Sequence, residues 1–263
     1  MTRHIQGSTT LLLSLSLSAC GGGGGGSDDG STAGSGGGAQ GPSLVVSNAA
    51  EGMWLGTSDA GASISGVILN DGSFYAVYST RSDKDVIGGV VTGTGQASNG
   101  SFTVKDAVDF NFDRYGVNSI SVSASYFTKS SLSGVLTYAN RDTSTFSTQY
   151  NPAYEQPANA TLATGTYTGN AVSSAGTQTA FMTLQANGTI TGVVAGCNFS
   201  GVATPRGSVN VFNLSVTFRG GSCTFGTDTL TGIGFYNIPR KQFYIAAPNT
   251  ARSDGLFFQG TRP

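Results

Sequence analysis

Closely spaced acidic and amide side chains form the stretch of this chain best suited to metal chemistry. Asp109, Asn111 and Asp113 begin like a calcium-binding EF-hand loop, in which oxygen ligands alternate along the chain. The sixth position of that loop is Arg114 instead of glycine, and the twelfth is Ile120 instead of glutamate. We therefore expect no calcium site here and no bound metal.

Asp106 lies in a strict alternation of apolar and polar residues, which is typical of a half-buried strand. This alternation places Asp109 and Asn111 on the solvent face and Asp106 on the apolar face. Asp106 is therefore expected to cap a hydrogen-bond network in the core, to pair with an arginine or lysine, or to mark a small polar cavity inside the barrel. A catalytic acid is the least expected of its roles. The apolar face is predicted to hold Phe102, Val104, Asp106, Val108, Phe110 and Phe112.

Histidine chemistry is nearly absent from the sequence, because His4 is the only histidine. This excludes Ser-His-Asp and Cys-His nucleophiles and histidine-bound zinc from the rest of the chain. The carboxylates give no recognisable pair for glycoside hydrolysis. We expect no catalytic residue, no cofactor and no enzymatic activity, and the lack of a basic patch argues against a nucleic-acid partner.

The composition indicates an all-β fold. Charged residues make up 10% of the chain and 40 residues are glycine, while β-branched and aromatic residues are frequent. Alternating runs such as Phe212 to Phe218 predict antiparallel strands, and no segment has a helical period. Asp71-Gly72 and Asn187-Gly188 each join two such runs, and both predict type I′ hairpin turns.

The two halves of the chain are related. Gly52-Met53-Trp54-Leu55-Gly56 matches Gly165-Thr166-Tyr167-Thr168-Gly169, and each precedes one of the hairpins by a similar distance. Residues 132–138 also match residues 230–236. We predict two related antiparallel units of barrel or sandwich type, at residues 43–150 and 161–263. A proline-containing linker at residues 151–160 separates them.

The start of the chain resembles the signal sequence of bacterial lipoproteins. Arg3 is followed by a short Leu/Ser-rich apolar run and by Leu17-Ser18-Ala19-Cys20, which is similar to a lipobox. The resemblance implies a signal peptide at residues 1–19 and diacylglycerol on Cys20. It also implies an anchor in the outer membrane, facing the periplasm or the cell surface. Residues 20–42 are predicted to be a disordered Gly/Ser tether.

With Cys20 assigned to lipid, two cysteines are left in an oxidising compartment. Cys197 and Cys223 are therefore expected to form a disulfide, since they lack the Cys-x-x-Cys spacing of redox sites.

Gly52-x-Trp54 and Gly165-x-Tyr167, together with the glycine-rich strand rhythm, resemble lipocalin-like barrels. They also resemble the barrels of transferrin-binding surface lipoproteins. The resemblance implies a barrel shape, with Trp54 and Tyr167 in the core or against a ligand.

Two functions follow as expectations. One is a non-catalytic interaction module that presents loops to another protein from solid barrels. The other is a lipocalin-like carrier of a small apolar ligand in an open barrel, lined by residues such as Tyr75, Tyr126 and Phe212. A continuous apolar cavity would favour the carrier.

Overall fold

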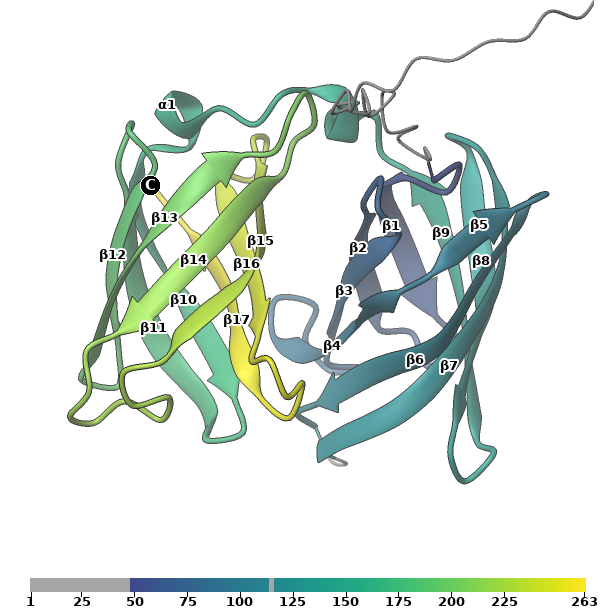
Figure 1. Ribbon diagram of the computed structural model, residues 1–263, viewed down its shortest axis with the longest axis horizontal. Helices are drawn as coiled ribbons and strands as arrows, with labels where there is room; N and C mark the ends of the chain where they lie inside the picture. Colours follow the sequence, from purple (N-terminus) through teal and green to yellow (C-terminus); the bar gives the residue numbers. More distant parts are fainter. Residues whose placement is uncertain (1–47, 114–115) are drawn as a thin grey trace, which may run out of the picture. The chain divides into compact units, whose positions relative to one another are not determined.

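The computed structural model describes residues 48–113 and 116–263, which fold into two closed antiparallel barrels (Figure 1). The predicted all-β class with two antiparallel units is confirmed, and both units are barrels. The signal-like segment, Cys20 and the glycine-rich tether lie outside the described residues.

The first barrel contains nine strands, eight of which form the ring. Neighbours along the chain pair with each other, β1 pairs with β9, and β4 pairs with β6, so the ring closes. The short β5 pairs with one end of β6. The strands are β1 (Gly52–Ser58), β2 (Ser63–Ile68), β3 (Ser73–Ser79), β4 (Ile87–Thr94), β5 (Gln96–Ser98), β6 (Ser101–Asn111), β7 (Gly116–Phe127), β8 (Ser131–Tyr138) and β9 (Thr143–Tyr150).

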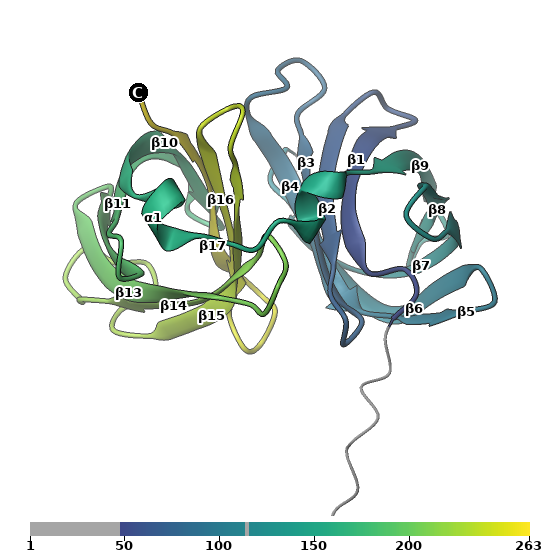
Figure 2. The same cartoon turned by 90° about the horizontal axis from the view of Figure 1, so that it is seen from above.

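The second barrel is an eight-stranded ring closed between β10 and β17. Its strands are β10 (Gly165–Ser173), β11 (Gly176–Leu184), β12 (Thr189–Val194), β13 (Cys197–Pro205), β14 (Phe212–Phe218), β15 (Thr229–Asn237), β16 (Gln242–Pro248) and β17 (Gly255–Thr261). Two short helices precede it, η1 (Pro152–Glu155) and α1 (Ala160–Ala163). Asn159 caps α1 by accepting from the Leu162 backbone N–H, and α1 lies at one end of the second barrel (Figure 2).

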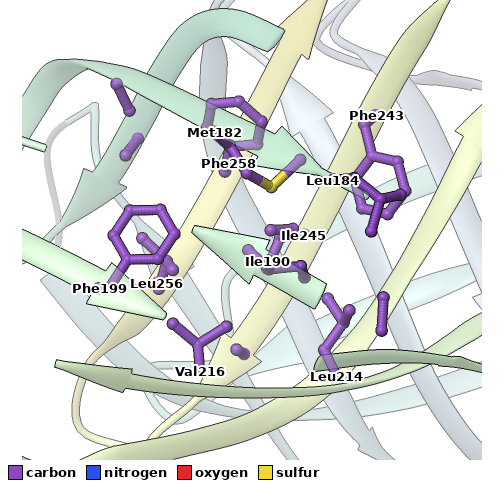
Figure 3. Packing of buried hydrophobic residues seen from close by; sticks show 14 of the residues in the cluster. Met182, Leu184, Ile190, Phe199, Leu214, Val216, Phe243, Ile245, Leu256 and Phe258 are labelled. Carbon is purple, nitrogen blue, oxygen red and sulfur yellow. The ribbon is translucent and has the colours of Figure 1, made fainter. Parts of the chain in front are cut away.

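The second barrel has a packed apolar interior. Side chains from all of its strands meet along the axis, and Figure 3 shows part of this cluster, including Met182, Ile190, Phe199 and Phe258. Met182 and Ile190 are completely buried. The interior is therefore a solid core of the kind that small barrels fill with side chains.

A β-bulge in β6 overturns the predicted placement of the aspartates. Val104 pairs with Val122 and Ala107 with Ile120, so Lys105 and Asp106 together face the single residue Ser121. This one-residue shift exchanges the two faces of the strand beyond the bulge.

Asp106 was expected on the apolar face, but it is 75% exposed. Of the roles expected for it, the structure shows the ion pair with an arginine, since Asp106 lies 2.6 Å from Arg252. Asp109 was expected in solvent, but it is 0% exposed. Val108 and Phe110 instead point out of the barrel and are buried against Phe257 and its neighbours.

The two predicted hairpins are confirmed, but not their turn type. Gly72 N–H donates to the Leu69 carbonyl, and Gly188 N–H donates to the Gln185 carbonyl. Within these turns only the glycines have positive φ, 83° and 85°, whereas a type I′ turn needs two such residues. Each turn is therefore a type I turn followed by a glycine bulge.

Outward-facing side chains of the two barrels pack together in two apolar clusters, here called the seam. One contains Met53, Leu69, Phe235 and Tyr244, and the other contains Phe110 and Phe257 with several valines. Tyr154, from the segment predicted as a linker, is buried in the first of these clusters. Residues 48–113 and 116–263 accordingly belong to one compact unit.

Strand pairing relates the two barrels position by position. We align Trp54 with Tyr167 and then follow the paired residues from strand to strand around each ring. On return to the first strands, β1 and β10, the alignment is still the same, with Gly56 matching Gly169. The matched residues 132–138 and 230–236 are an exception, because they form the seventh strand of one ring and the sixth of the other. Corresponding inward positions include Gly66 and Met182, Gly89 and Cys197, Ala107 and Val216, Asp109 and Phe218, and Ser144 and Leu256.

Candidate functional site

The first barrel encloses a cavity of about 1110 Å³. Its wall is formed by inward-facing residues of the ring, and it reaches the loops at the end of the barrel remote from η1. There the exposed side chains of Arg81, Asp113 and Asp142 line its rim. The cavity is large enough for a small organic molecule, since such pockets typically measure about 300–1,000 Å³.

Trp54 forms part of the cavity wall near its closed end and is 1% exposed. Its indole N–H donates to the Ala50 carbonyl, and its ring meets Tyr150 edge to face at 5.5 Å. These contacts fix the position of the indole ring. Trp54 thus belongs to the buried core of the first barrel and also lines the cavity.

Small residues create the hollow. Gly66 and Ala76 face each other on β2 and β3, and both lie on the cavity wall. In the second barrel the positions of these two residues are taken by Met182 and Gly192, with the Phe199 ring lying over the glycine. Side chains at the level of Trp54 therefore leave space in the first barrel and fill it in the second.

A buried carboxylate lies between two tyrosines of the cavity wall, near the open end of the barrel. The Tyr78 hydroxyl donates to Asp109 Oδ1 and the Tyr138 hydroxyl donates to Oδ2, both at 2.8 Å. Tyr78 comes from β3 and Tyr138 from β8, while Asp109 lies on β6 between them. Each tyrosine therefore reaches across one intervening strand to the same carboxylate.

Gly89 makes the Tyr78 contact possible. It pairs with Tyr78 across β3 and β4, and a Cβ atom at this position would lie 2.1 Å from the Tyr78 hydroxyl. The Tyr78 ring passes over the bare backbone of β4 to reach Asp109. Any side chain at Gly89 would displace it.

Burial dominates the electrostatics of this group. It raises the pKa of Asp109 above its ordinary value, although hydrogen bonds from Tyr78, Tyr138 and Asn111 act in the opposite direction. Burial and the adjacent carboxylate raise the pKa of both tyrosines far above the ordinary value. Both hydroxyls therefore keep their protons, which are directed at Asp109.

The remaining predicted site residues lie elsewhere. Tyr167 is completely buried in the core of the second barrel, and its hydroxyl donates to the Ala163 carbonyl, as Trp54 does to Ala50. Tyr126 and Phe212, expected on the wall of an open barrel, are core residues of the first and second barrels. Tyr75 does contribute to the cavity surface.

The predicted disulfide between Cys197 and Cys223 is confirmed. It ties the loop of residues 219–228 to the first residue of β13, and Phe225 of this loop packs on Phe218 with 5.0 Å between ring centroids. The loop thus covers the end of the second barrel that corresponds to the open end of the first.

Tyr78, Asp109 and Tyr138 are not predictable from the sequence as a group. Their distance in the chain gives no local motif, and the bulge at Lys105 and Asp106 reverses the face on which Asp109 lies. The one available signal was the pair of adjacent polar residues that interrupts the apolar alternation of β6.

No family model matches this chain, and no curated protein matches it. Among residues 48–113 and 116–263, no helix has the length and apolar character needed to cross a bilayer. In the same part of the chain, no group of three His, Cys, Asp or Glu side chains is placed to hold a metal ion.

Proposed function

We propose that this chain is a non-catalytic binding protein whose first barrel takes up a small, largely apolar ligand. The observation that carries the proposal is the cavity of about 1110 Å³. Aromatic and aliphatic side chains line its deeper part, and serine, threonine, asparagine and charged side chains are numerous toward the open end. Apolar surface combined with polar groups that fix orientation is typical of a small-molecule site. Of the two functions expected from the sequence, the hollow interior favours the ligand carrier.

The topology supports the same proposal. The ring of the first barrel follows chain order, and Gly52-x-Trp54 lies on its first strand. Up-and-down barrels of eight strands are able to hold one small ligand, as lipocalins do. The alternative function, an interaction module, predicted two solid barrels, and only the second barrel is solid.

Trp54 provides the test, because it is the only tryptophan of the chain and lies on the cavity wall. The full chain with Cys20→Ser, purified without detergent, is titrated with the uncharged fluorophore N-phenyl-1-naphthylamine. We expect saturable energy transfer from Trp54 at one probe per chain. Native mass spectrometry of the same sample identifies any ligand that is purified with the protein.

Gly66→Met is the blocking variant. A Cβ atom at Gly66 would make ordinary contact with Ala76 at 3.4 Å, so the longer side chain would extend into the hollow. Thr103→Met is the matched control, because Thr103 is exposed on the outer face of β6. Loss of transfer in Gly66→Met alone supports the proposal, whereas absent transfer in the parent chain or equal transfer in Gly66→Met overturns it.

We also propose that lipid on Cys20 anchors the protein to the outer membrane. The support is the Leu17-Ser18-Ala19-Cys20 motif, followed by a Gly/Ser-rich segment long enough to separate the barrels from the membrane. The mass of the amino-terminal peptide of the native protein tests this directly. An unmodified Cys20, or a Cys20→Ala variant that stays with the outer membrane, would contradict it.

A further inference from the structure

The hydroxyl groups of Tyr78 and Tyr138 can act only as hydrogen-bond acceptors toward a ligand. A tyrosine hydroxyl has one proton, and both Tyr78 and Tyr138 donate theirs to Asp109. Tyr78 and Tyr138 both line the cavity, so their hydroxyl oxygens have only lone pairs to offer to a ligand that reaches them. A ligand group that meets them must donate hydrogen bonds.

The carboxylate of Asp109, to which these hydroxyls donate, has no positively charged partner among the described residues. The hydrogen-bond partners of Asp109 are Tyr78, Tyr138 and Asn111, all of them uncharged. The ion pairs of the described residues involve Asp71, Asp106 and Glu155, and Asp109 takes part in none of them. Since a buried carboxylate without a counter-charge is costly, a cation in the cavity would stabilise the ionised form.

The surroundings of the two hydroxyls also favour a positive group. Tyr78, Tyr138 and Phe146 contribute to the cavity surface, and the faces of aromatic rings attract cations. Among the described rim residues, the carboxylates of Asp113 and Asp142 outnumber the guanidinium of Arg81. Deeper in the cavity, Ile68, Leu136 and Trp54 offer apolar surface to the rest of a ligand.

We infer that the ligand is a cationic amphiphile. Its apolar body fills the hollow of the first barrel, and its protonated amine donates to the hydroxyl oxygens of Tyr78 and Tyr138 in front of Asp109. This inference rests on the proposed function and names the ligand class for the same cavity. A carboxylate ligand would meet lone pairs and a buried negative charge, and a neutral alcohol would satisfy the hydrogen bonds without balancing the charge.

The test compares three probes of equal chain length: decylamine, decanol and decanoate. Each displaces N-phenyl-1-naphthylamine from the full Cys20→Ser chain below its micelle concentration, and the energy transfer from Trp54 reports the displacement. We expect decylamine to bind at least about tenfold more tightly than decanol, and decanoate to bind most weakly.

Asp109→Asn keeps the shape of the side chain and removes its charge. We expect it to abolish the preference for decylamine while the affinity for decanol changes less than about twofold. Asp228→Asn removes the same charge from an exposed residue at the end of the loop of the second barrel, and the preference should persist. The ratio of the two affinities is the decisive readout, because a purely structural role of Asp109 would weaken both probes together.

Tyr138→Phe keeps the inference falsifiable if Asp109→Asn does not fold, since it removes one lone-pair oxygen and should reduce the preference. Equal binding of all three probes, tighter binding of decanoate, or an unchanged preference in the folded Asp109→Asn chain overturns the inference and leaves the carrier function intact. Failure of all three probes and of the fluorophore overturns the proposed function itself.

Discussion

The two barrels share one pattern of strand pairing and differ in what their inward positions carry. Where the second barrel has Met182, Val216 and Phe218, the first has Gly66, Ala107 and Asp109. Where the second barrel has a disulfide-tied loop over its end, the first has only the short connection between β6 and β7. Corresponding side chains on one framework thus make either a solid core or a hollow interior.

Contacts at the seam compensate the first barrel for its missing core. A hollow barrel loses the dispersion and hydrophobic contacts that its missing core would supply. The first barrel regains burial on its outside, where Val90, Phe110 and Val77 pack against residues of the second barrel such as Phe257. The filled barrel therefore serves as a support for the hollow one.

The largest effect is expected at the seam. Phe257 is completely buried, and its ring lies 4.9 Å from Phe110 and 5.6 Å from Phe112. Phe257→Ala should lower the free energy of unfolding by about 3–5 kcal/mol. Phe181→Ala, at a ring that is 48% exposed on β11, should change it by less than about 0.5 kcal/mol.

Denaturation followed by Trp54 fluorescence and by circular dichroism measures this loss and tests the coupling of the barrels. Coincident transitions are expected in the parent chain. Two well-separated transitions in the parent chain would show that the filled barrel does not support the hollow one.

Removing the disulfide should act on the filled barrel. The bridge closes a loop with a sequence separation of 26 residues, so Cys197→Ser with Cys223→Ser should cost about 3–4 kcal/mol. Ligand binding in the first barrel, measured as above at a temperature where the variant is folded, should stay unchanged. A matching loss of ligand affinity would mean that the loop of the second barrel contributes to the cavity.

The reciprocal exchange at the Gly66 and Met182 positions sharpens the contrast between the barrels. Met182→Ala opens a void in a closed core and should destabilise the protein by about 2–5 kcal/mol. Gly66→Met buries a side chain in existing space and should leave stability unchanged or increased, while binding is lost. Thermal denaturation of both variants distinguishes these results, and a loss of stability in Gly66→Met would show that the first barrel is not hollow in solution.

The smallest effect concerns the pH dependence of stability. The pKa of Asp109 is raised in the folded state, so the folded protein binds this proton more tightly than the unfolded chain does. Asp109 therefore contributes to the free energy of unfolding at acidic pH. This contribution declines as the pH rises from the ordinary pKa of aspartate through the raised pKa of Asp109. Tyr78, Tyr138 and Asn111 are the groups that contact it.

Asp109→Asn should accordingly gain stability relative to the parent chain as pH rises from acidic to neutral. Unfolding curves for both proteins across this range measure the difference. Asp106→Asn is the control, since Asp106 is exposed. A difference between parent and Asp109→Asn that does not change with pH would mean that Asp109 titrates as an ordinary surface carboxylate.

Particular residues show which parts of the fold and of the candidate site are predictable from the sequence. Alternation identified strands, the two turn glycines located hairpins, and the Gly-x-Trp and Gly-x-Tyr motifs marked equivalent first strands, because each signal acts over a few residues. The cavity cluster was not predictable in this way. Asp109 was assigned to the wrong face because the bulge at Lys105 and Asp106 depends on pairing with β7, and Tyr78 and Tyr138 meet only when the ring is closed.

Ring closure has a consequence for how such a protein behaves at high concentration. Open sheets expose unpaired backbone groups at their edges, and these groups template pairing with other chains. In both rings every strand has a partner on each side, and the three-residue β5 is too short to extend far. Many copies crowded on one surface would thus meet through side chains, without a route to shared sheets or fibres.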